Sequence, residues 1–430
     1  MTHRISPDVF AALAAGGGGT EAIRQLRAAR RSKNMLLLRA VLDLVVEKGH
    51  PSAGFTLATF ELLSRMQKQA PEAVAGVLGY PLFGAWVLRT AVLLDQDEIG
   101  EAEPDGLASF AAAAAVRGSI GAVVELPPGD QVRLPSIGVA HFPNPTGEPI
   151  RLVDGALSDG RTNIPIRSGS PHWTPIPRIS AEHHGLRLDL AVDDLGAHRV
   201  PDSITIADRL ADQNIADEWR YRIGEGWRIL AQHHREVAVE VAAAVNVLAP
   251  LAGSAPGQLS ATFNDSFGCV AMSLPADARS TALTFAHEVQ HAKLSALMDL
   301  FPLIKPGDPD YFYSPWRKDP RPASGLLQGI YAYLGVTGFW RRQYRAETDE
   351  DHRWQAEVEF ARWRTAGRDA AHDLANSTRL TPTGRTFLTG TRQVLDAWHT
   401  DRISPDAQAE ANRRATEHRR HWLTRSSQAP

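Results

Sequence analysis

Two histidines and a glutamate at residues 287–291 have the types and spacing best suited to chemistry in this chain. His287, Glu288 and His291 form the pattern H-E-x-x-H inside the segment TALTFAHEVQHAKLSALMDL. Four residues make slightly more than one helical turn, so both imidazoles project from the same face of a helix. Two neutral imidazoles one turn apart can hold a single zinc, iron or related ion, with Glu288 close by. The segment therefore predicts a metal site.

The residues around the motif favour a metal over a pair of packed histidines. Leu283, Ala286, Leu294 and Leu297 form an apolar stripe, which predicts that one side of the helix is buried. Buried imidazoles and a buried carboxylate without a ligand would leave costly polar groups in the interior. Asp277 is placed to cap the N-terminus of this helix.

The spacing of the other candidate ligands does not fix a third one. The longer pattern H-E-x-x-H-x-x-G-x-x-H is absent, because Leu294 and Leu297 occupy its glycine and last histidine positions. Glu347 and Asp351 have the E-x-x-x-D spacing of one class of zinc peptidases, but their run AETDEDHR is typical of a solvated turn. Five further histidines could donate, and no spacing selects among them: His141, His172, His183, His184 and His352.

A second segment, residues 311–341, combines arginines with aromatic and proline residues. Prolines at 315, 320 and 322 stiffen a stretch in which Arg317 and Arg321 lie four residues apart, beside Trp316. A rigid arginine pair flanked by an aromatic ring is suited to bind a carboxylate in a bidentate fashion. The alternative is a structural network of these arginines with Asp319 or Asp299.

The elements that must position these residues are predicted to be mainly helical. Apolar residues at three- and four-residue spacing predict helices over much of residues 5–100 and at 107–116. Short alternating runs between proline and glycine turns predict a β-rich, antiparallel stretch that ends near residue 206. Beyond it we expect a helix over 208–248, a strand or hairpin at 260–275, and helices at 326–346, 352–375 and 380–398.

The fold class expected from these elements is α+β, with a β-rich middle and a zincin-like H-E-x-x-H helix. The expected regions are a helical one at 1–118, a β-rich one at 119–206, a helical catalytic one at 207–400 and a polar tail at 401–430. The tail is expected to be loosely held or helical at the surface.

The composition excludes several classes of protein. The 430 residues are 43% hydrophobic and 22% charged, which is ordinary for a globular protein with an ample core. A net charge of −3 gives no electrostatic case for nucleic acid or anionic membrane as a partner. The single cysteine, Cys269, excludes an intramolecular disulfide framework and a thiolate-rich zinc site. With no leader-like start and no apolar stretch approaching 18 residues, a cytoplasmic location is expected. The sequence carries no signal for an oligomeric state.

The motif and the arginine segment together resemble a known family. AHEVQHAKLSALMDLFPL, followed by YSPWRKDPRPASGLLQGIYAYLGVTGFW, is similar to the H-E-x-x-H-type peptide-modification proteins of bacterial gene clusters for ribosomally made, modified peptides. SKNMLLLRAVLD and LTPTGRTFL extend the likeness to about residues 20–390, and it is strongest over 281–341. The pairing of the H-E-x-x-H helix with the P-W-R-x-D-P-R-P segment is far more specific than the short motif alone.

The resemblance implies an iron(II)- and 2-oxoglutarate-dependent peptide β-hydroxylase that uses O2 and acts on a precursor peptide. Carried over by position, it implies that His287 and His291 ligate iron(II) and that Glu288 lies close to the metal. Arg317 or Arg321 would bind the distal carboxylate of 2-oxoglutarate.

The chain departs from the family on the helix after the Pro-Arg-Pro segment. Family members sometimes place a histidine there, whereas this chain has Gln328, Tyr331 and Tyr333, so the resemblance supplies no third ligand. Gln328, Tyr331 and Trp316 are candidates to line the pocket, as are Tyr313, Tyr333 and Trp340.

Two other functions fit the same residues. In a zinc metallopeptidase, Glu288 would be the general base for zinc-bound water and Glu347 a possible third ligand. In a metal-free protein that binds a precursor peptide, the motif would be vestigial. The three functions differ in metal and in reaction, so metal analysis and product analysis separate them.

Overall fold

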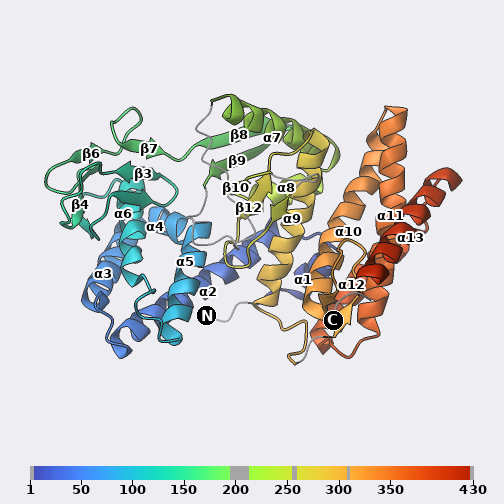
Figure 1. Ribbon diagram of the computed structural model, residues 1–430, viewed down its shortest axis with the longest axis horizontal. Coiled ribbons are helices and arrows are strands. Elements are labelled where there is room, and N and C mark those ends of the chain that lie inside the picture. The colour runs from blue at the N-terminus through green and yellow to red at the C-terminus, as the bar shows by residue number, and fades with distance from the viewer. Residues whose placement is uncertain (1–3, 194–212, 254–258, 308–309, 427–430) are drawn as a thin grey trace.

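The computed structural model describes residues 4–193, 213–253, 259–307 and 310–426, and its architecture is α+β and mainly helical, as predicted. The N-terminal helices and two small sheets form one end of an elongated molecule (Figure 1). A mixed sheet and its covering helices form the middle, and the C-terminal helices form the other end. The chain segments predicted at 194–206 and 208–212 lie outside the described residues.

The N-terminal end is built from helices that share a core with two antiparallel sheets. The helices are α2 (Gly19–Glu47), whose second half enters this core, α3 (Ala53–Gln69), α4 (Pro71–Leu78), α5 (Pro81–Asp95), a 3-10 turn (Pro104–Gly106) and α6 (Leu107–Arg117). Helix α1 (Pro7–Ala14) lies instead in a separate core with the C-terminal helices. One sheet has the order β1-β4-β5-β6 and the other β2-β3-β7. The strands are β1 (Val124–Leu126), β2 (Gln131–Leu134), β3 (Gly138–His141), β4 (Ile150–Val153), β5 (Ala156–Ser158), β6 (Asn163–Pro165) and β7 (Trp173–Pro175). Alanines of α6, leucines and valines of the strands and aromatic residues of α5 are buried together, so helices and sheets stabilise one another.

The central sheet has the order β11-β12-β10-β9-β8 and is mixed. Its strands are β8 (Arg178–His183), β9 (Leu186–Val192), β10 (Val247–Leu251), β11 (Ser260–Ala261) and β12 (Cys269–Ser273). β10 pairs in parallel with both β9 and β12, while β8 and β11 add antiparallel edges. The pairings among β1–β9 are antiparallel, as predicted, but the parallel pairing of β9 and β12 with β10 was not predicted.

The long helix predicted over 208–248 is broken at His234 and ends at Ala244, before the predicted end. The described chain forms α7 (Gln213–His233) and α8 (Arg235–Ala244), and Val247–Leu251 is strand β10. Every residue of β10 is buried. A strand that is buried on both faces reads as a continuous apolar run, which periodicity cannot distinguish from a buried helix.

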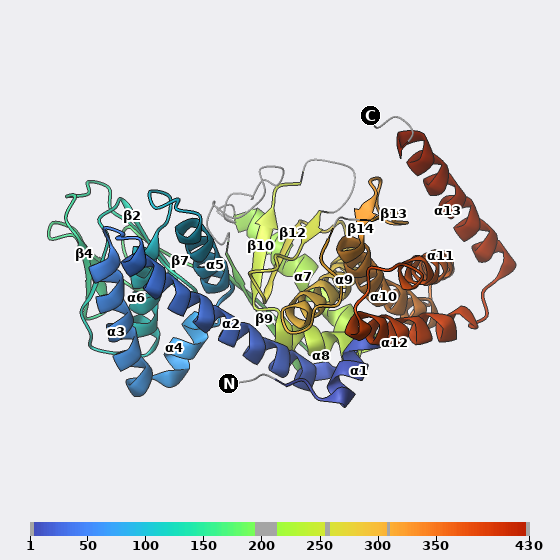
Figure 2. The ribbon, with the colours of Figure 1, turned by 90° about the horizontal axis from the view of Figure 1, so that it is seen from below.

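Long helices follow the sheet and carry the predicted site. They are α9 (Ala278–Met298), α10 (Ala323–Ala346), α11 (Glu350–Ala375), α12 (Pro382–His399) and α13 (Pro405–Ser426), with the short pair β13 (Tyr311–Phe312) and β14 (Arg321–Pro322) before α10. Helix α9 packs against α7, α8 and α10. Figure 2 shows α13, which corresponds to the predicted polar tail, extending along the outside of α11.

The side of α9 that faces α1 and α2 carries a buried ion pair. Lys293 Nζ lies 2.6 Å from Glu240 Oε2 of α8, and both side chains are almost fully buried. Lys293 also donates to the carbonyl oxygens of Gly16 and Gly17, and the Gly19 amide donates to Glu240 Oε1. The glycine-rich loop between α1 and α2 is thereby tied to the helix that carries H-E-x-x-H.

Glycine is required at Gly16 in this loop. Its φ is +86°, and a Cβ built there would lie 2.6 Å from the Leu334 side chain. Both the left-handed backbone and the close approach of α10 exclude a side chain.

Among the described residues, no single helix combines the length and apolar character needed to cross a membrane. The bent pair α4–α5 meets the requirement only as two helices joined at 64°.

Candidate metal centre

Helix α9 presents His287, Glu288 and His291 as the sequence predicts. The Asp277 side chain accepts a hydrogen bond from the Ser280 amide at 2.7 Å and so caps the start of the helix. On the core side of α9, Ala286, Leu294 and Leu297 are buried. The histidines lie at the flank of this stripe, where α9 borders a cavity, and Leu283 of the predicted stripe lines that cavity with them.

The two imidazoles converge on one point. Nε2 of His287 lies 3.1 Å from Nε2 of His291. Two nitrogens that separation apart, each about 2.1 Å from a common ion, subtend about 95° at the ion, which fits adjacent ligands of one metal. Burial lowers the pKa of His287 to about 4, so this imidazole is neutral at pH 7, as a ligand must be. The histidine pair therefore fits a metal ion.

Gln328 of α10 orients His291. The amide oxygen Oε1 of Gln328 lies 3.0 Å from His291 Nδ1, and an amide oxygen can only accept, so Nδ1 carries the proton. Gln328 is held by donating through Nε2 to Ser295 Oγ, which in turn donates to Asn264 Oδ1 at 2.8 Å. The lone pair of His291 is therefore on Nε2 and points at His287, which is the tautomer that a metal site requires.

Glu288 lies beside the histidine pair and is 1% exposed. Thr262 Oγ1 donates to its Oε2 at 2.5 Å. Its other oxygen, Oε1, is 3.9 Å from His287 Nε2. The carboxylate is thus held on one oxygen and directed towards the histidines with the other, where it could accept a proton or approach a bound metal.

The third protein ligand is not supplied by the other predicted donors. Glu347 accepts from Gln343 and lies 4.0 Å from Arg279, and Asp351 is exposed in the first turn of α11. His352 lies near Asp349 on the surface. The remaining four histidines lie on or beside strands away from α9: His141, His172, His183 and His184. Across the described ranges, no cluster of three histidine, cysteine, aspartate or glutamate side chains could hold a metal ion.

The histidines open into a cavity of about 670 Å³ between α9, α10, α11 and the 313–321 segment. Its lining includes most of the pocket residues predicted from the sequence: Trp316, Arg317, Arg321, Gln328, Tyr333 and Trp340. The Tyr333 ring stacks on Trp316 at 4.6 Å and meets the His287 ring edge-on at 5.6 Å. These rings form an apolar wall of the cavity beside His287.

Two of the predicted pocket residues lie elsewhere. Tyr331 is 1% exposed and is not among the cavity-lining residues; its hydroxyl donates to the Leu13 carbonyl at 2.6 Å. It is off the stripe of α10 that faces the cavity, which runs through Gly329 and Tyr333. Tyr313 lines a separate groove, and its hydroxyl is 2.8 Å from His418 Nδ1.

Arg317 and Arg321 reach the cavity and also share one carboxylate. Arg317 Nε lies 3.1 Å from Asp319 Oδ1, and Arg321 Nη1 lies 3.1 Å from Asp319 Oδ2. The ion-pair network of both arginines with Asp319, which was one alternative considered from the sequence, is therefore present. Each guanidinium is partly exposed and keeps further donors for an anionic ligand.

Three polar side chains at the site could not be found from sequence spacing. Thr262 and Asn264 come from the loop between β11 and β12, which no motif marks. Glu359 of α11 also lines the cavity; Trp363 Nε1 donates to its Oε2 at 2.7 Å, and Arg414 of α13 lies 2.8 Å from its Oε1. Because Glu357 and Arg362 are also charged, the charge of Glu359 does not stand out in the sequence of α11.

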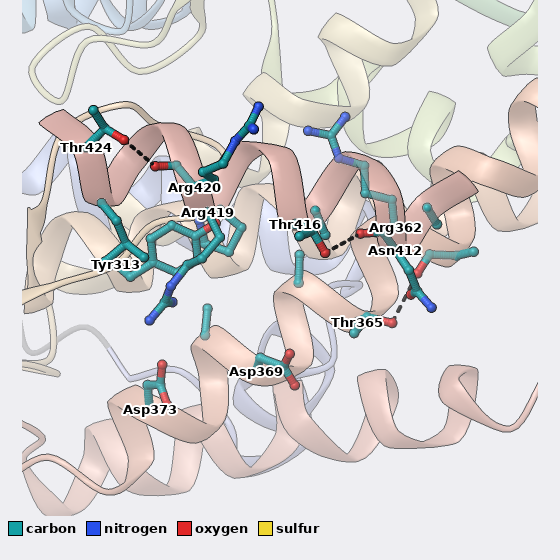
Figure 3. Close-up of a pocket in the computed structure, with 17 residues that line it drawn as sticks. Tyr313, Arg362, Thr365, Asp369, Asp373, Asn412, Thr416, Arg419, Arg420 and Thr424 are labelled. Carbon is teal, nitrogen blue, oxygen red and sulfur yellow. Dashed lines mark hydrogen bonds between the residues drawn. The ribbon is translucent and has the colours of Figure 1, made fainter. Parts of the chain in front are cut away.

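A groove of about 630 Å³ between α11 and α13 adjoins this cavity. The two hollows use neighbouring residues of the same segments, with Pro315 and Arg362 on the groove and Trp316 and Trp363 on the cavity. Figure 3 shows the groove, with acidic side chains from α11 and basic side chains from α13: Asp369, Asp373, Arg419 and Arg420. Alanines of both helices form most of its apolar lining.

Comparison with protein-family models and with curated proteins found no match to this chain.

Proposed function

We propose that this protein is an iron(II)- and 2-oxoglutarate-dependent oxygenase that hydroxylates a side chain of a ribosomally made precursor peptide. The observation that carries the proposal is the convergence of His287 and His291 in a cavity that two arginines also line. The likeness of residues 281–341 to peptide β-hydroxylases supports the same function.

Iron(II) would be held by Nε2 of His287 and His291, with Glu288 beside it. When bound, iron(II) supplies positions for 2-oxoglutarate and O2 and the redox chemistry of C–H hydroxylation. In overall balance, 2-oxoglutarate and O2 give succinate and CO2. One oxygen atom of O2 enters succinate, and the other enters the new C–OH group of the peptide.

The chain's own side chains position the reactants. Gln328 keeps His291 in the metal-binding tautomer. Arg321 is the better candidate for the distal carboxylate of 2-oxoglutarate, because it is less exposed than Arg317 and packs over Gly325 at the start of α10. Asp319 would then remain paired with Arg317. The stacked Trp316 and Tyr333 rings shield the reacting centre from water.

The groove between α11 and α13 gives a peptide somewhere to lie outside the cavity. A substrate side chain must enter the cavity while the rest of the peptide remains outside it. The groove shares the 313–317 and 359–363 segments with the cavity and offers both apolar and charged surface.

Anaerobic titration with iron(II) and 2-oxoglutarate tests the metal centre without a peptide. We expect one iron per chain and the absorption band of 2-oxoglutarate chelated to iron(II). His291→Ala should abolish both, whereas His352→Ala, an exposed histidine outside the cavity, should leave both unchanged. Equal binding by wild type and His291→Ala would overturn the site.

Turnover separates the proposed activity from the alternatives. With iron(II), ascorbate, 2-oxoglutarate and the peptide encoded beside this chain's gene, we expect succinate release and a peptide heavier by one oxygen atom. Zinc-dependent cleavage of the peptide would identify a metallopeptidase with Glu288 as general base. Peptide binding without stoichiometric iron or zinc would identify a binding protein.

A further inference from the structure

A separate cavity of about 410 Å³ lies between α2, the start of α5 and the loop of residues 262–267. Four arginines of α2 line it: Arg24, Arg27, Arg30 and Arg31. Asp265 is the one carboxylate in its described lining. The cavity is therefore strongly basic in a chain whose net charge is −3.

Arg24 is paired with Glu21 one turn earlier on α2, at 2.6 Å, but among the described residues the other three arginines have no carboxylate of their own. Arg27 donates to the backbone carbonyls of Ala243 and Ala244 at the end of α8, which carry no charge. Arg31 makes no hydrogen bond or ion pair with the described part of the chain. Arg30 shares Asp299 with Lys33, so two cations compete for one carboxylate.

Arg30 is the buried member of the group. It is 7% exposed, and its Nε makes no hydrogen bond with any described residue. Burial lowers the pKa of this guanidinium, although Asp299 and Asp265 oppose the shift. A buried guanidinium with an unsatisfied donor is costly unless an acceptor reaches it.

The start of α5 adds to the positive potential. Gly79, Tyr80 and Pro81 line the cavity, and the Tyr80 side chain does not cap the helix. The N-terminus of this 15-residue helix carries the positive end of its dipole, which favours an anion nearby.

We propose that this cavity binds a small phosphate-bearing molecule. Guanidinium groups match the geometry of phosphate oxygens and bind them through paired hydrogen bonds. The cavity is much larger than one phosphate group, and the Phe267 and Tyr80 rings in its lining offer contact for an organic part.

Calorimetric titration tests the proposal with three probes: inorganic phosphate, pyrophosphate and adenosine monophosphate, at constant low ionic strength. We expect saturable binding of one molecule per chain. Tighter binding of the nucleotide identifies a phosphate ester as the ligand, and tighter binding of pyrophosphate identifies an inorganic anion.

Arg31→Gln should weaken binding about fivefold or more, since it removes a charged donor from the cavity. Arg65→Gln is the matched control, because it removes an exposed arginine of α3 outside the cavity. Arg24→Gln is a second cavity variant, and thermal melting checks that each variant is folded. No saturable binding of any probe, or equal weakening by Arg31→Gln and Arg65→Gln, overturns the proposal.

Discussion

The buried ion pair between Lys293 and Glu240 gives the sharpest test of how α9 is held. Lys293→Met keeps the length of the side chain but removes the cation from a carboxylate that is 3% exposed. Breaking one partner of a buried pair costs about 3–5 kcal/mol. Unfolding entropy of about 2.1 cal/mol/K per residue gives about 0.9 kcal/mol/K for a chain of 430 residues that unfolds cooperatively. The melting temperature should therefore fall by about 3–6 °C.

The stability of the Glu240→Gln variant should depend on pH with a definite sign. Burial lowers the pKa of Lys293 and attraction to Glu240 opposes that shift, so Glu240→Gln leaves a buried ammonium that loses its proton more readily than in the unfolded chain. Between that lowered pKa and about 10.5 the unfolded state binds more protons, and stability rises with pH.

Melting curves of wild type and both variants at pH 5.5, 7 and 9 measure these effects. The stability deficit of Glu240→Gln relative to wild type should shrink at pH 9. Arg39→Met, which breaks the exposed pair with Asp43, is the control and should not change the melting temperature. The reasoning is refuted if Lys293→Met melts like the control, or if the deficit of Glu240→Gln does not shrink from pH 7 to pH 9.

Further predictions concern the metal centre, the packing of α10 and a buried histidine. Gln328→Met removes the acceptor that orients a metal-binding imidazole and should weaken iron(II) affinity about 10–100-fold in an equilibrium titration; unchanged affinity would contradict this role. Gly329→Ala places a Cβ 2.2 Å from Trp316 Nε1, so it should lower the melting temperature and alter tryptophan fluorescence, whereas Gly54→Ala, with open space around it, should do neither. Burial lowers the pKa of His234 to about 4, so the unfolded chain binds more protons below pH 6.5, and about 3 kcal/mol of stability should be lost from pH 6.5 to pH 4. His234→Phe should flatten that loss in acid melting curves, and an unchanged slope would count against the assignment.

The parts of the site that follow from local patterns were predictable. Asp277 caps α9 and His287 and His291 share one face, because capping and helical spacing depend on a few neighbouring residues. The arginine segment also reaches the cavity, as its pairing with the motif suggested.

The contacts that orient these side chains come from distant segments and leave little trace in the sequence. Thr262 and Asn264 reach α9 from the loop before β12, and Gln328 reaches it from α10. Tyr331 was misplaced because an aromatic residue near the motif fits a pocket and a core equally well. Only the rotation of α10, set by packing against α9 and α11, assigns it to the core.

The division into four regions remains a prediction, although the elements show why the tail is ordered. Because the sequence of α13 is polar, it shows no apolar face from which its packing could be predicted. Its attachment to α11 instead uses ion pairs and small residues, such as Arg414 with Glu359 and the buried Ala411.

The loop of residues 262–267 takes part in both sites. Thr262 donates a hydrogen bond to Glu288 at the candidate metal centre, and Asp265 and Phe267 line the arginine-rich cavity. If a bound anion shifts this loop, the conformational free energy of the loop depends on both the anion and the metal ion. Thermodynamic reciprocity then requires the anion to change metal affinity by the same factor by which the metal changes anion affinity. The loop would then couple the binding of the two ligands energetically, without direct contact between them.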